Sequence, residues 1–493
     1  MKNLLVIILV LTPLLSACGA SQPAAPQTPG IALTDCLLTA PGSIAQLTAQ
    51  CGTLSVPENR VEPMGRTIEL FIAVVPAISR SPAPDPLFFL TGGPGQAATE
   101  SGVLLSTAFE QVHQKRDIVL VDQRGTGKSN PLKCPALDEA PPSEAETQRF
   151  VQNCLDALDA DPTQYTTTIA MQDLDAVRQA LGYEQINLYG VSYGTRAAQT
   201  YMKMFPERVR SAVLDGVVPQ SEPLGMYVAQ DAQRALDLIF AHCLADSSCN
   251  RAFPGVGQDF NALVERLRTK AQEVHLVDPL SGAPTSFSFG QPELASAVRL
   301  LSYTPETAAL LPLLVNDADR EGDLNRLAAQ YLIVAGQLNE SISQGMNYSV
   351  LCAEDQPFID REQVQRLNRG TYLGDLQMDE LAEICAVWPA GQVPADFHAP
   401  LESQTPVLLL SGEVDPVTPP AKAEEVARFL PNSRSIVVQG QGHNVVFRGC
   451  LPWLMTDFIE SASVEKLDLT CLEEITPAPF FLNFSGPVMS EKP

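Results

Sequence analysis

The chain has 493 residues, of which 45% are hydrophobic and 18% are charged, so it is long enough to bury a large core. Its 57 acidic residues outnumber its 32 basic residues, and the formal net charge is −25. This charge argues against nucleic acid as a partner and against electrostatic attachment to anionic lipid. The chain contains no HExxH sequence, no glycine-rich dinucleotide fingerprint and no cysteines at zinc-ligand spacing, so we expect neither a metal nor a cofactor.

The N-terminus has the pattern of an export signal. Lys2 supplies a positive charge, Leu4–Leu15 is an apolar run, and small residues precede Cys18. The run is too short to span a membrane as a mature helix, so residues 1–17 predict a signal peptide. Small residues just before a cysteine resemble the bacterial lipobox, which implies cleavage before Cys18 and lipidation of that residue. The alternative is an ordinary signal peptide whose cysteine is incidental.

The lipoprotein interpretation predicts a protein of the bacterial cell envelope. Gly19 follows the cysteine, in place of the aspartate that usually signals retention in the inner membrane. We therefore expect a lipid anchor in the outer membrane, facing the periplasm, as the protein's only attachment to a membrane. Residues 18–30 would then form the anchor and a flexible tether rich in Pro, Ala, Gln and Ser.

The cysteine count agrees with export to an oxidising compartment. The eleven cysteines become an even set when Cys18 is set aside for the lipid. Sequence alone does not give the connectivity, so pairing each cysteine with its nearest neighbour is a hypothesis. The pairs would be Cys36 with Cys51, Cys134 with Cys154, Cys243 with Cys249, Cys352 with Cys385, and Cys450 with Cys471. The periplasm is a compartment where such bonds form and persist.

The first half of the chain contains strands that end in loops. Leu54–Pro57 and Thr67–Val75 predict antiparallel edge strands. Asp85–Gln96 is an apolar strand that runs into a glycine-rich turn, and Arg116–Ser129 is another buried strand that ends in a loop. A glycine-rich turn exposes backbone N–H groups, and we expect that of Gly93 to form one half of an oxyanion hole.

The triplet Gly127–Ser129 has the sequence Gly-Lys-Ser, which also ends the nucleotide-binding P-loop motif. That motif requires a glycine five positions before its Gly-Lys pair, and Asp122 stands there. Pro131 and Pro135 also interrupt the helix that would have to follow. We therefore reject nucleotide binding at this loop.

The most informative stretch is Gly190–Gly194, which carries Ser192 between two glycines. Gln185–Tyr189 before it predicts a buried strand, and Thr195–Phe205 after it predicts a helix. A serine on such a strand-to-helix turn is the nucleophile elbow of an α/β-hydrolase, where the backbone is strained and the glycines avoid collisions. The turn would expose the serine hydroxyl and direct the Tyr193 amide toward a substrate carbonyl.

A long helical segment follows the next strand, Arg208–Gly216. Between Val218 and about Glu402 the strand pattern disappears and amphipathic helices dominate. The helical stretches are Gln230–His242, Asn261–Val274, Pro292–Ser302, Thr304–Val315 and Leu324–Ala335. We expect a cap inserted before the acid-bearing strand and lying over the catalytic edge as a lid. The alternative is a separate domain with no role at the site.

The last part of the chain supplies an acid and a base, each after a strand. The strand from Pro406 leads to Asp415, and the strand from Ser433 leads to His443. The chain order Ser, Asp, His is that of the α/β-hydrolase fold. The other histidines all precede Asp415, so elimination leaves His443 as the base; they are His113, His242, His275 and His398.

These residues predict acyl transfer through a catalytic triad. His443 would take the proton of Ser192, Asp415 would orient the imidazolium, and the amides of Gly93 and Tyr193 would hold the oxyanion. The fold class expected is α/β, namely an α/β-hydrolase with a mainly parallel, doubly wound sheet. Its core would comprise residues 31–217 and 403–493, and the helical cap would comprise residues 218–402.

Taken together, the motifs resemble the proline iminopeptidase family of serine peptidases. They are Gly92–Gly95, Asp122–Ser129, Gly190–Gly194 and Gly412–Pro419. The secreted tripeptidyl-aminopeptidase-like branch is the most similar, and its C-terminal portion resembles the segment from about Thr405 onward. The resemblance implies an exopeptidase that acts on peptide N-termini. Thr91 and Gln96 depart from the family, which often has histidine at the first position and glycine or serine at the second.

An aminopeptidase must recognise a free α-ammonium group, and burying that cation requires a carboxylate partner. The segment Cys352–Asp355 resembles a cap segment common in the family. The resemblance makes Glu354 the candidate anchor for the substrate amine, with Asp355 as the second choice.

Three functions therefore remain open from the sequence. The first is a serine exopeptidase acting on peptide substrates. The second is a carboxylesterase or another acyl hydrolase, because the same triad cleaves esters and a fold does not choose the leaving group. The third is a non-catalytic binding lipoprotein that kept the fold, against which the intact triad argues. The sequence leaves the oligomeric state unknown.

Overall fold

The computed structural model describes residues 30–135 and 144–487. The predicted signal peptide, the candidate lipidation site Cys18 and the tether before residue 30 lie outside these ranges. Within them, no helix is both long enough and apolar enough to cross a membrane.

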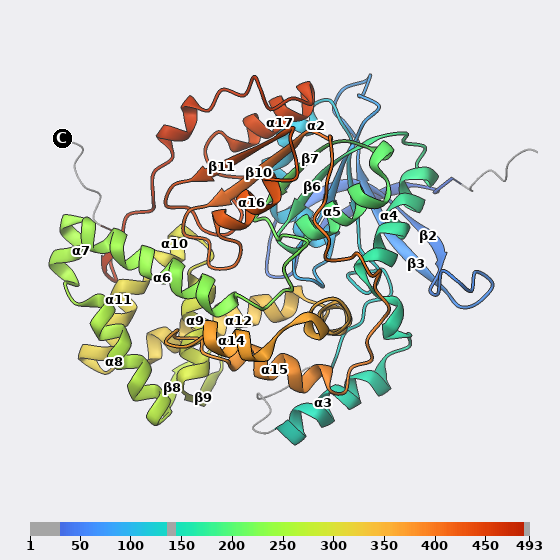
Figure 1. Ribbon diagram of the computed structural model, residues 1–493. Helices are drawn as coiled ribbons and strands as arrows, with labels where there is room; N and C mark the ends of the chain where they lie inside the picture. Colours follow the sequence, from blue (N-terminus) through green and yellow to red (C-terminus); the bar gives the residue numbers. More distant parts are fainter. Residues whose placement is uncertain (1–29, 136–143, 488–493) are drawn as a thin grey trace, which may run out of the picture.

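The core is a sheet that has nine strands within the described residues, in the order β1-β2-β3-β5-β4-β6-β7-β10-β11 (Figure 1). The strands are β1 (Thr34–Thr39), β2 (Gln46–Pro57), β3 (Thr67–Val75), β4 (Leu87–Leu90), β5 (Ile118–Val121), β6 (Ile186–Val191), β7 (Val209–Asp215), β10 (Val407–Gly412) and β11 (Ser433–Val438). The pairs β1–β2, β2–β3 and β3–β5 are antiparallel, and the remaining pairs are parallel. The predicted mainly parallel sheet with antiparallel N-terminal edge strands is confirmed.

The strands at the centre of the sheet are apolar on both faces because helices cover both sides. Neighbouring residues show this alternation, since Phe88 packs into the core on one face and Phe89 into the core on the other. The first core includes α4 (Thr167–Ala180), α5 (Tyr193–Met204) and α16 (Pro420–Ala427). The second includes α1 (Ala98–Leu104), α2 (Glu110–His113) and α17 (Leu451–Ser461).

A mostly helical segment lies between β7 and β10 and has a hydrophobic core of its own (Figure 1). Its helices are α6 (Val228–Ala245), α7 (Ser247–Ala252), α8 (Val256–Thr269), α9 (Gln291–Leu301), α10 (Pro305–Ala308), α11 (Leu311–Asn316), α12 (Asn325–Ser341), α13 (Gln344–Val350), α14 (Arg361–Leu367) and α15 (Leu376–Cys385). The helix α3 (Glu144–Ala157), from the first part of the chain, lies beside α15 in Figure 1. We call the segment between β7 and β10 the cap.

The cap is not purely helical, which corrects the sequence analysis. The helix expected over Asn261–Val274 ends at Thr269, and a hairpin follows, formed by β8 (Gln272–Val277) and β9 (Pro284–Phe289). Val274 is the one buried residue of β8, and the strand does alternate between less exposed and exposed positions, but it has only six residues, and so short a run is easily taken for the end of the preceding helix.

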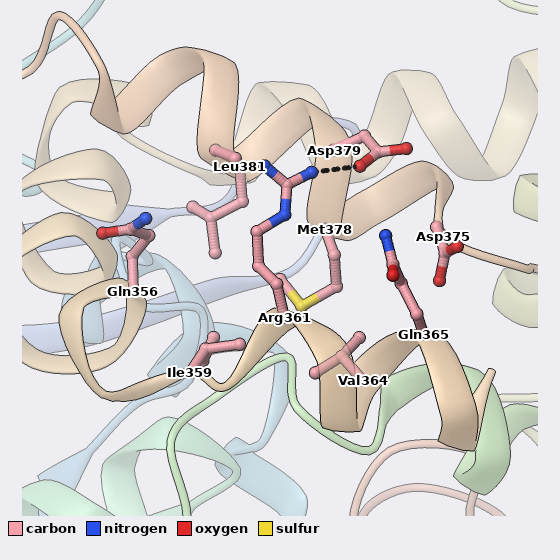
Figure 2. Close-up of a pocket in the computed structure, with 10 residues that line it drawn as sticks. Gln356, Ile359, Arg361, Val364, Gln365, Asp375, Met378, Asp379 and Leu381 are labelled. Atoms are coloured by element: carbon pink, nitrogen blue, oxygen red, sulfur yellow. Dashed lines mark hydrogen bonds and ion pairs between the residues drawn. The ribbon is translucent and has the colours of Figure 1, made fainter.

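Helices α14 and α15 face each other across a small hollow in the cap (Figure 2). The apolar side chains Ile359, Val364 and Leu381 contribute to its lining. Arg361 on α14 and Asp379 on α15 form an ion pair of 2.7 Å at this hollow, and both side chains are more than half exposed.

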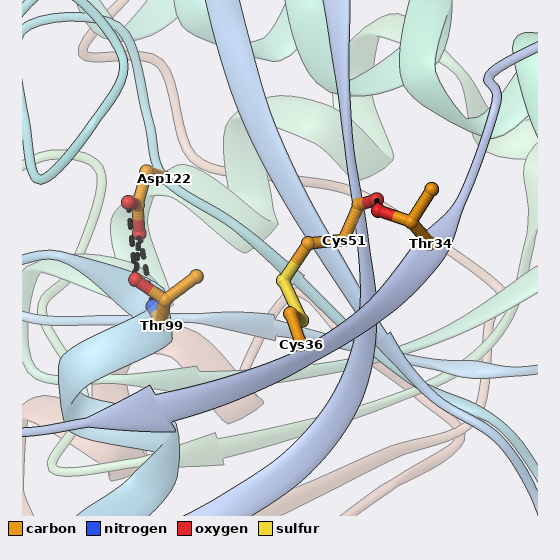
Figure 3. Close-up of a disulfide and its surroundings, with 5 residues drawn as sticks. All are labelled: Thr34, Cys36, Cys51, Thr99 and Asp122. Atoms are coloured by element: carbon orange, nitrogen blue, oxygen red, sulfur yellow. Dashed lines mark hydrogen bonds between the residues drawn. A yellow bond between two sulfur atoms is a disulfide. The ribbon is translucent and has the colours of Figure 1, made fainter.

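The described residues contain five disulfides, and their pairs are those of the nearest-neighbour hypothesis. Cys36–Cys51 joins β1 to β2 at the antiparallel edge of the sheet (Figure 3). Cys134–Cys154 and Cys352–Cys385 belong to one small cluster with Trp388, which links α3 to the cap. The disulfides therefore crosslink the antiparallel edge of the sheet and the junctions between other elements, outside the central parallel strands.

Candidate active site

Ser192 lies on the turn between β6 and α5, with φ of 55° and ψ of −126°. A non-glycine residue with positive φ is strained, as a nucleophile elbow requires. The flanking glycines are required by close backbone contacts. A Cβ on Gly190 would lie 2.5 Å from the carbonyl oxygen of Gly194, and a Cβ on Gly194 would lie 2.1 Å from that of Leu90.

Replacing Gly194 with alanine is expected to lower the free energy of unfolding by more than about 2 kcal/mol, because the new methyl group meets rigid backbone. The matched control is Gly257→Ala in α8, where the added Cβ has no neighbour within 4 Å. It should leave stability unchanged or raise it by up to about 1 kcal/mol. Urea unfolding of both variants tests this, and equal midpoints would contradict it.

Asp415 and His443 form a buried pair. The Nδ1 atom of His443 lies 2.8 Å from Oδ2 of Asp415. The other oxygen, Oδ1, accepts hydrogen bonds from the amides of Val417 and Thr418, at 2.8 and 2.9 Å. Burial opposes ionisation of Asp415, but the His443 charge and the hydrogen bonds outweigh burial and lower its pKa to about 2. The carboxylate is therefore ionised and its orientation is fixed.

Asp215, at the end of β7, links the serine turn to the histidine loop. Its carbonyl oxygen accepts the amide of Ser192 at 2.9 Å. Its carboxylate accepts the amides of Val445 and Val446, just after His443, and the hydroxyl of Tyr189. Ser192 and His443 are thus held at the same edge of the sheet. Sequence analysis missed this role, although an acid that ends a buried strand was a visible signal.

The cap also contacts the histidine directly. The His443 amide donates to the carbonyl oxygen of Tyr303 at 2.7 Å, and the two rings meet edge to face with centroids 5.2 Å apart. Gly442 permits this approach, because a Cβ there would lie 2.3 Å from the Tyr303 oxygen. Tyr303 was not identified from the sequence, since nothing in a single chain links it to a residue 140 positions away.

The glycine-rich turn after β4 lies beside Ser192, since a Cβ on Gly92 would be 3.2 Å from the Cβ of Ser192. In the described part of the chain, the amides of Gly93 and Tyr193 have no hydrogen-bond acceptor. Free amides beside a serine hydroxyl are the donors that an oxyanion hole needs.

The cap holds this turn in place. Ser343 donates its amide to the carbonyl oxygen of Gly95 at 2.9 Å, and the Asn347 side chain donates to that of Pro94 at 3.0 Å. Gln96, one of the two departures from the family, donates its side-chain amide to the hydroxyl of Ser341. Thr91, the other departure, donates its hydroxyl to Ser101. Gln96 therefore adds a bond between the turn and the cap.

Comparison with known protein families agrees with this arrangement. Residues 85–250 match the family described as the alpha/beta hydrolase fold, and this match contains the turn after β4 and the serine elbow. This protein is an α/β-hydrolase. Residues 371–471 match the family described as TAP-like protein, so that similarity begins within the cap, earlier than the expected Thr405. The predicted resemblance is confirmed.

The hydrolase is similar along most of its length to curated proteins. It is 27% identical over 472 residues to "Serine protease Hip1" of Mycobacterium tuberculosis, which covers 86% of this chain and 87% of that protein. It is also 27% identical over 476 residues to "Tripeptidyl aminopeptidase" of Streptomyces coelicolor, covering 87% and 84%. A third relative, "Carboxylesterase B" of M. tuberculosis, is 27% identical over 471 residues, covering 86% of each.

The predicted amine anchor, Glu354, lies inside the hydrolase rather than on an open surface. It is fully buried, and its carboxylate accepts hydrogen bonds from the amide and the hydroxyl of Thr167, at 2.5 and 2.7 Å. The Thr167 hydroxyl in turn contacts the phenol oxygen of Tyr193 at 2.6 Å. Glu354 thus supports the side chain of Tyr193, whose amide is a predicted donor of the oxyanion hole. Its role as the amine anchor stays a prediction.

Asp355, the second candidate anchor, is also fully buried and pairs with Arg196 on α5 at 2.7 Å. Both carboxylates therefore already have partners within the hydrolase. No group of three or more His, Cys, Asp or Glu side chains in the described ranges is arranged to hold a metal ion.

Glu354 should make the stability of the hydrolase depend on pH. Burial, together with the neighbouring Asp355, raises the pKa of Glu354 from 4.5 to about 7. The folded chain thus keeps a proton that the unfolded chain releases, so the free energy of unfolding falls by about 3 kcal/mol as pH rises through this window. In Glu354→Gln this fall should disappear.

Urea unfolding at pH 5 and pH 8 measures this effect. The control is Glu362→Gln, which changes an exposed carboxylate of α14 and should keep the wild-type pH dependence. An unchanged pH dependence in Glu354→Gln would contradict the prediction.

Proposed function

We propose that this hydrolase is a serine exopeptidase that releases residues from the free N-terminus of peptides through an acyl-enzyme on Ser192. The observation that carries the proposal is the buried Asp415–His443 pair at 2.8 Å, held at the same sheet edge as Ser192. Two of the relatives bear the names of a serine protease and a tripeptidyl aminopeptidase, which supports peptides as the substrate class.

The reaction would begin when His443 takes the proton of Ser192 and the serine oxygen attacks the carbonyl carbon of the scissile bond. The amides of Gly93 and Tyr193 would hold the developing oxyanion. His443 would then give its proton to the leaving amine, and the C–N bond would break to leave an ester on Ser192. Water, activated by His443, would hydrolyse that ester and restore the serine.

The second candidate function is a carboxylesterase. The relative named Carboxylesterase B is as identical to this chain as the peptidase relatives are. The same nucleophile, base and oxyanion donors would serve an ester, whose alcohol leaves more easily than an amine.

The test compares the protein truncated after Cys18 with its Ser192→Ala form. Both are offered prolyl- and alanyl-anilides with a free or an acetylated amine, a tripeptidyl-anilide and a short-chain ester. We expect cleavage of free-amine anilides, no cleavage of their acetylated forms, and loss of activity in Ser192→Ala. Ester turnover alone would favour the carboxylesterase, and no Ser192-dependent turnover would contradict both functions.

We also propose that the protein is exported and anchored through Cys18 to the outer membrane. The disulfides support an oxidising compartment. Replacing Cys18 with serine should move the protein from the membrane fraction to the aqueous fraction of an expressing cell. Fractionation followed by immunoblotting measures this shift, and an unchanged membrane fraction would contradict the lipid anchor.

A further inference from the structure

Arg299, in the last turn of α9, is a partly buried cation without a carboxylate partner among the described residues. Its Nε atom is buried and has no hydrogen-bond acceptor, and its guanidinium forms no ion pair in the described ranges 30–135 and 144–487. A buried N–H group without an acceptor gives up its hydrogen bonds to water, so the Nε atom of Arg299 is a donor that a ligand would satisfy.

Arg299 lies next to the catalytic base through one aromatic ring. The guanidinium carbon is 5.7 Å from the centre of the Tyr303 ring, and that ring is 5.2 Å from the ring of His443. In the proposed reaction, His443 gives its proton to the leaving amine. The contacts of Tyr303 with His443 and with Arg299 therefore place the guanidinium near the base that would serve the leaving amine.

A second unpartnered donor lies in the same region. Tyr372, between α14 and α15, is 3% exposed, and its hydroxyl has no hydrogen-bond partner among the described residues. Burial raises the pKa of Tyr372, while the Arg299 cation acts to lower it and Tyr303 to raise it, so both lie within electrostatic reach of the phenol. The pair offers a guanidinium and a hydroxyl, and neither is matched by an acceptor.

We propose that Arg299 and Tyr372 bind the C-terminal carboxylate of the substrate's leaving part. A guanidinium binds a carboxylate through two parallel hydrogen bonds, and the phenol can donate a third. The steps of 5.2 and 5.7 Å put the guanidinium within about 11 Å of the His443 ring. An extended chain spans about 3.3–3.6 Å per residue, so the leaving part would have roughly two or three residues. The substrates would be short peptides with a free C-terminus.

This inference rests on the proposed function, and the experiment separates the two. The acyl part that gives the fastest anilide turnover is extended by two alanines, either as the free acid or as the C-terminal amide. The free acid should have a kcat/KM about 10- to 100-fold higher than the amide in the wild-type protein, as a charge-assisted hydrogen bond provides. This ratio should fall to about one in Arg299→Gln and by several-fold in Tyr372→Phe.

The matched control is Arg320→Gln, which removes an exposed cap arginine paired with Asp259 and should keep the wild-type ratio. An amide-ended peptide with glutamate as its second leaving residue tests the source of the carboxylate, and we expect it to be as slow as the plain amide. Turnover at the rate of the free acid would overturn recognition of the chain terminus.

A ratio of free-acid to amide kcat/KM near one in the wild-type protein overturns the inference, and so does a ratio that Arg299→Gln leaves unchanged. In either case, Ser192-dependent turnover of the anilides would still support the proposed function. Calorimetry on the Ser192→Ala protein tests the site without turnover. The product Ala-Ala should bind at least about tenfold more tightly than its amide, and Arg299→Gln should abolish this difference. Equal binding of the two dipeptides overturns the inference even if no peptide is cleaved.

Discussion

Replacing Asp415 with asparagine should lower kcat by about 10³- to 10⁴-fold while the fold remains intact. The amides of Val417 and Thr418 both point at Oδ1, so an asparagine would place its carbonyl oxygen there. Its NH₂ group would then face Nδ1 of His443, which would have to become an acceptor. The proton would move to Nε2, and the imidazole could no longer take a proton from Ser192.

Steady-state kinetics on the best substrate of the panel measure the effect, and thermal unfolding checks the fold. Thr418→Val gives a graded comparison, because it removes a hydroxyl that donates to Oδ2 at 2.7 Å and leaves the carboxylate in place. This substitution should lower kcat about tenfold, which corresponds to the loss of one hydrogen bond to a charged group. The assignment of Asp415 as the acid fails if Asp415→Asn keeps more than a tenth of the wild-type kcat.

Replacing Asp355 with asparagine should destabilise the protein by about 3–5 kcal/mol. Asp355 and Arg196 are both fully buried and lie 2.7 Å apart, so the neutral amide would leave a guanidinium in the core without its counter-charge. The same carboxylate oxygen accepts the amide of Leu224 at 2.7 Å. The pair joins the cap to α5, the helix that follows Ser192, so its loss should weaken the packing of the cap on this helix.

Asp379→Asn is the matched control, because it breaks an Arg–Asp pair of the same length between α14 and α15 (Figure 2). Its side chains are more than half exposed, and such pairs contribute about 0–1 kcal/mol. The free energies of unfolding of the two variants, measured with urea, should therefore differ by several kcal/mol. Equal losses would show that burial does not set the value of the Asp355 pair.

The sheet was predictable where its strands are buried on both faces. The runs that became β4 and β5 are continuous and apolar, and those of β6 and β10 are nearly so, with Asn187 and Ser411 as buried polar exceptions, because helices cover both sides of the sheet. The hairpin in the cap was missed because its two strands are short and mostly exposed. Burial alternates along β8, but the strand has six residues with only Val274 fully buried, and so weak a signal was absorbed into the helix expected before it.

The residues of the candidate site also divide into those that the sequence predicts and those that only the structure reveals. Ser192, Asp415 and His443 could be predicted as the triad because each stands in a loop after a strand, in an order that the fold fixes. The glycines around the serine are visible because close backbone contacts exclude every other residue there. These constraints act between near neighbours in sequence, or through the order of the strands, and a single chain displays both.

What the sequence alone determined is therefore the central sheet, the elbow and the candidates for the acid and the base. The tertiary structure alone decided which cap residues meet them: Tyr303 against His443, Ser343 against the turn after β4, and Glu354 beneath Tyr193. These contacts join segments more than 100 residues apart, and they depend on how the cap packs on the core. Local patterns do not encode such packing, because many arrangements of amphipathic helices bury the same apolar faces.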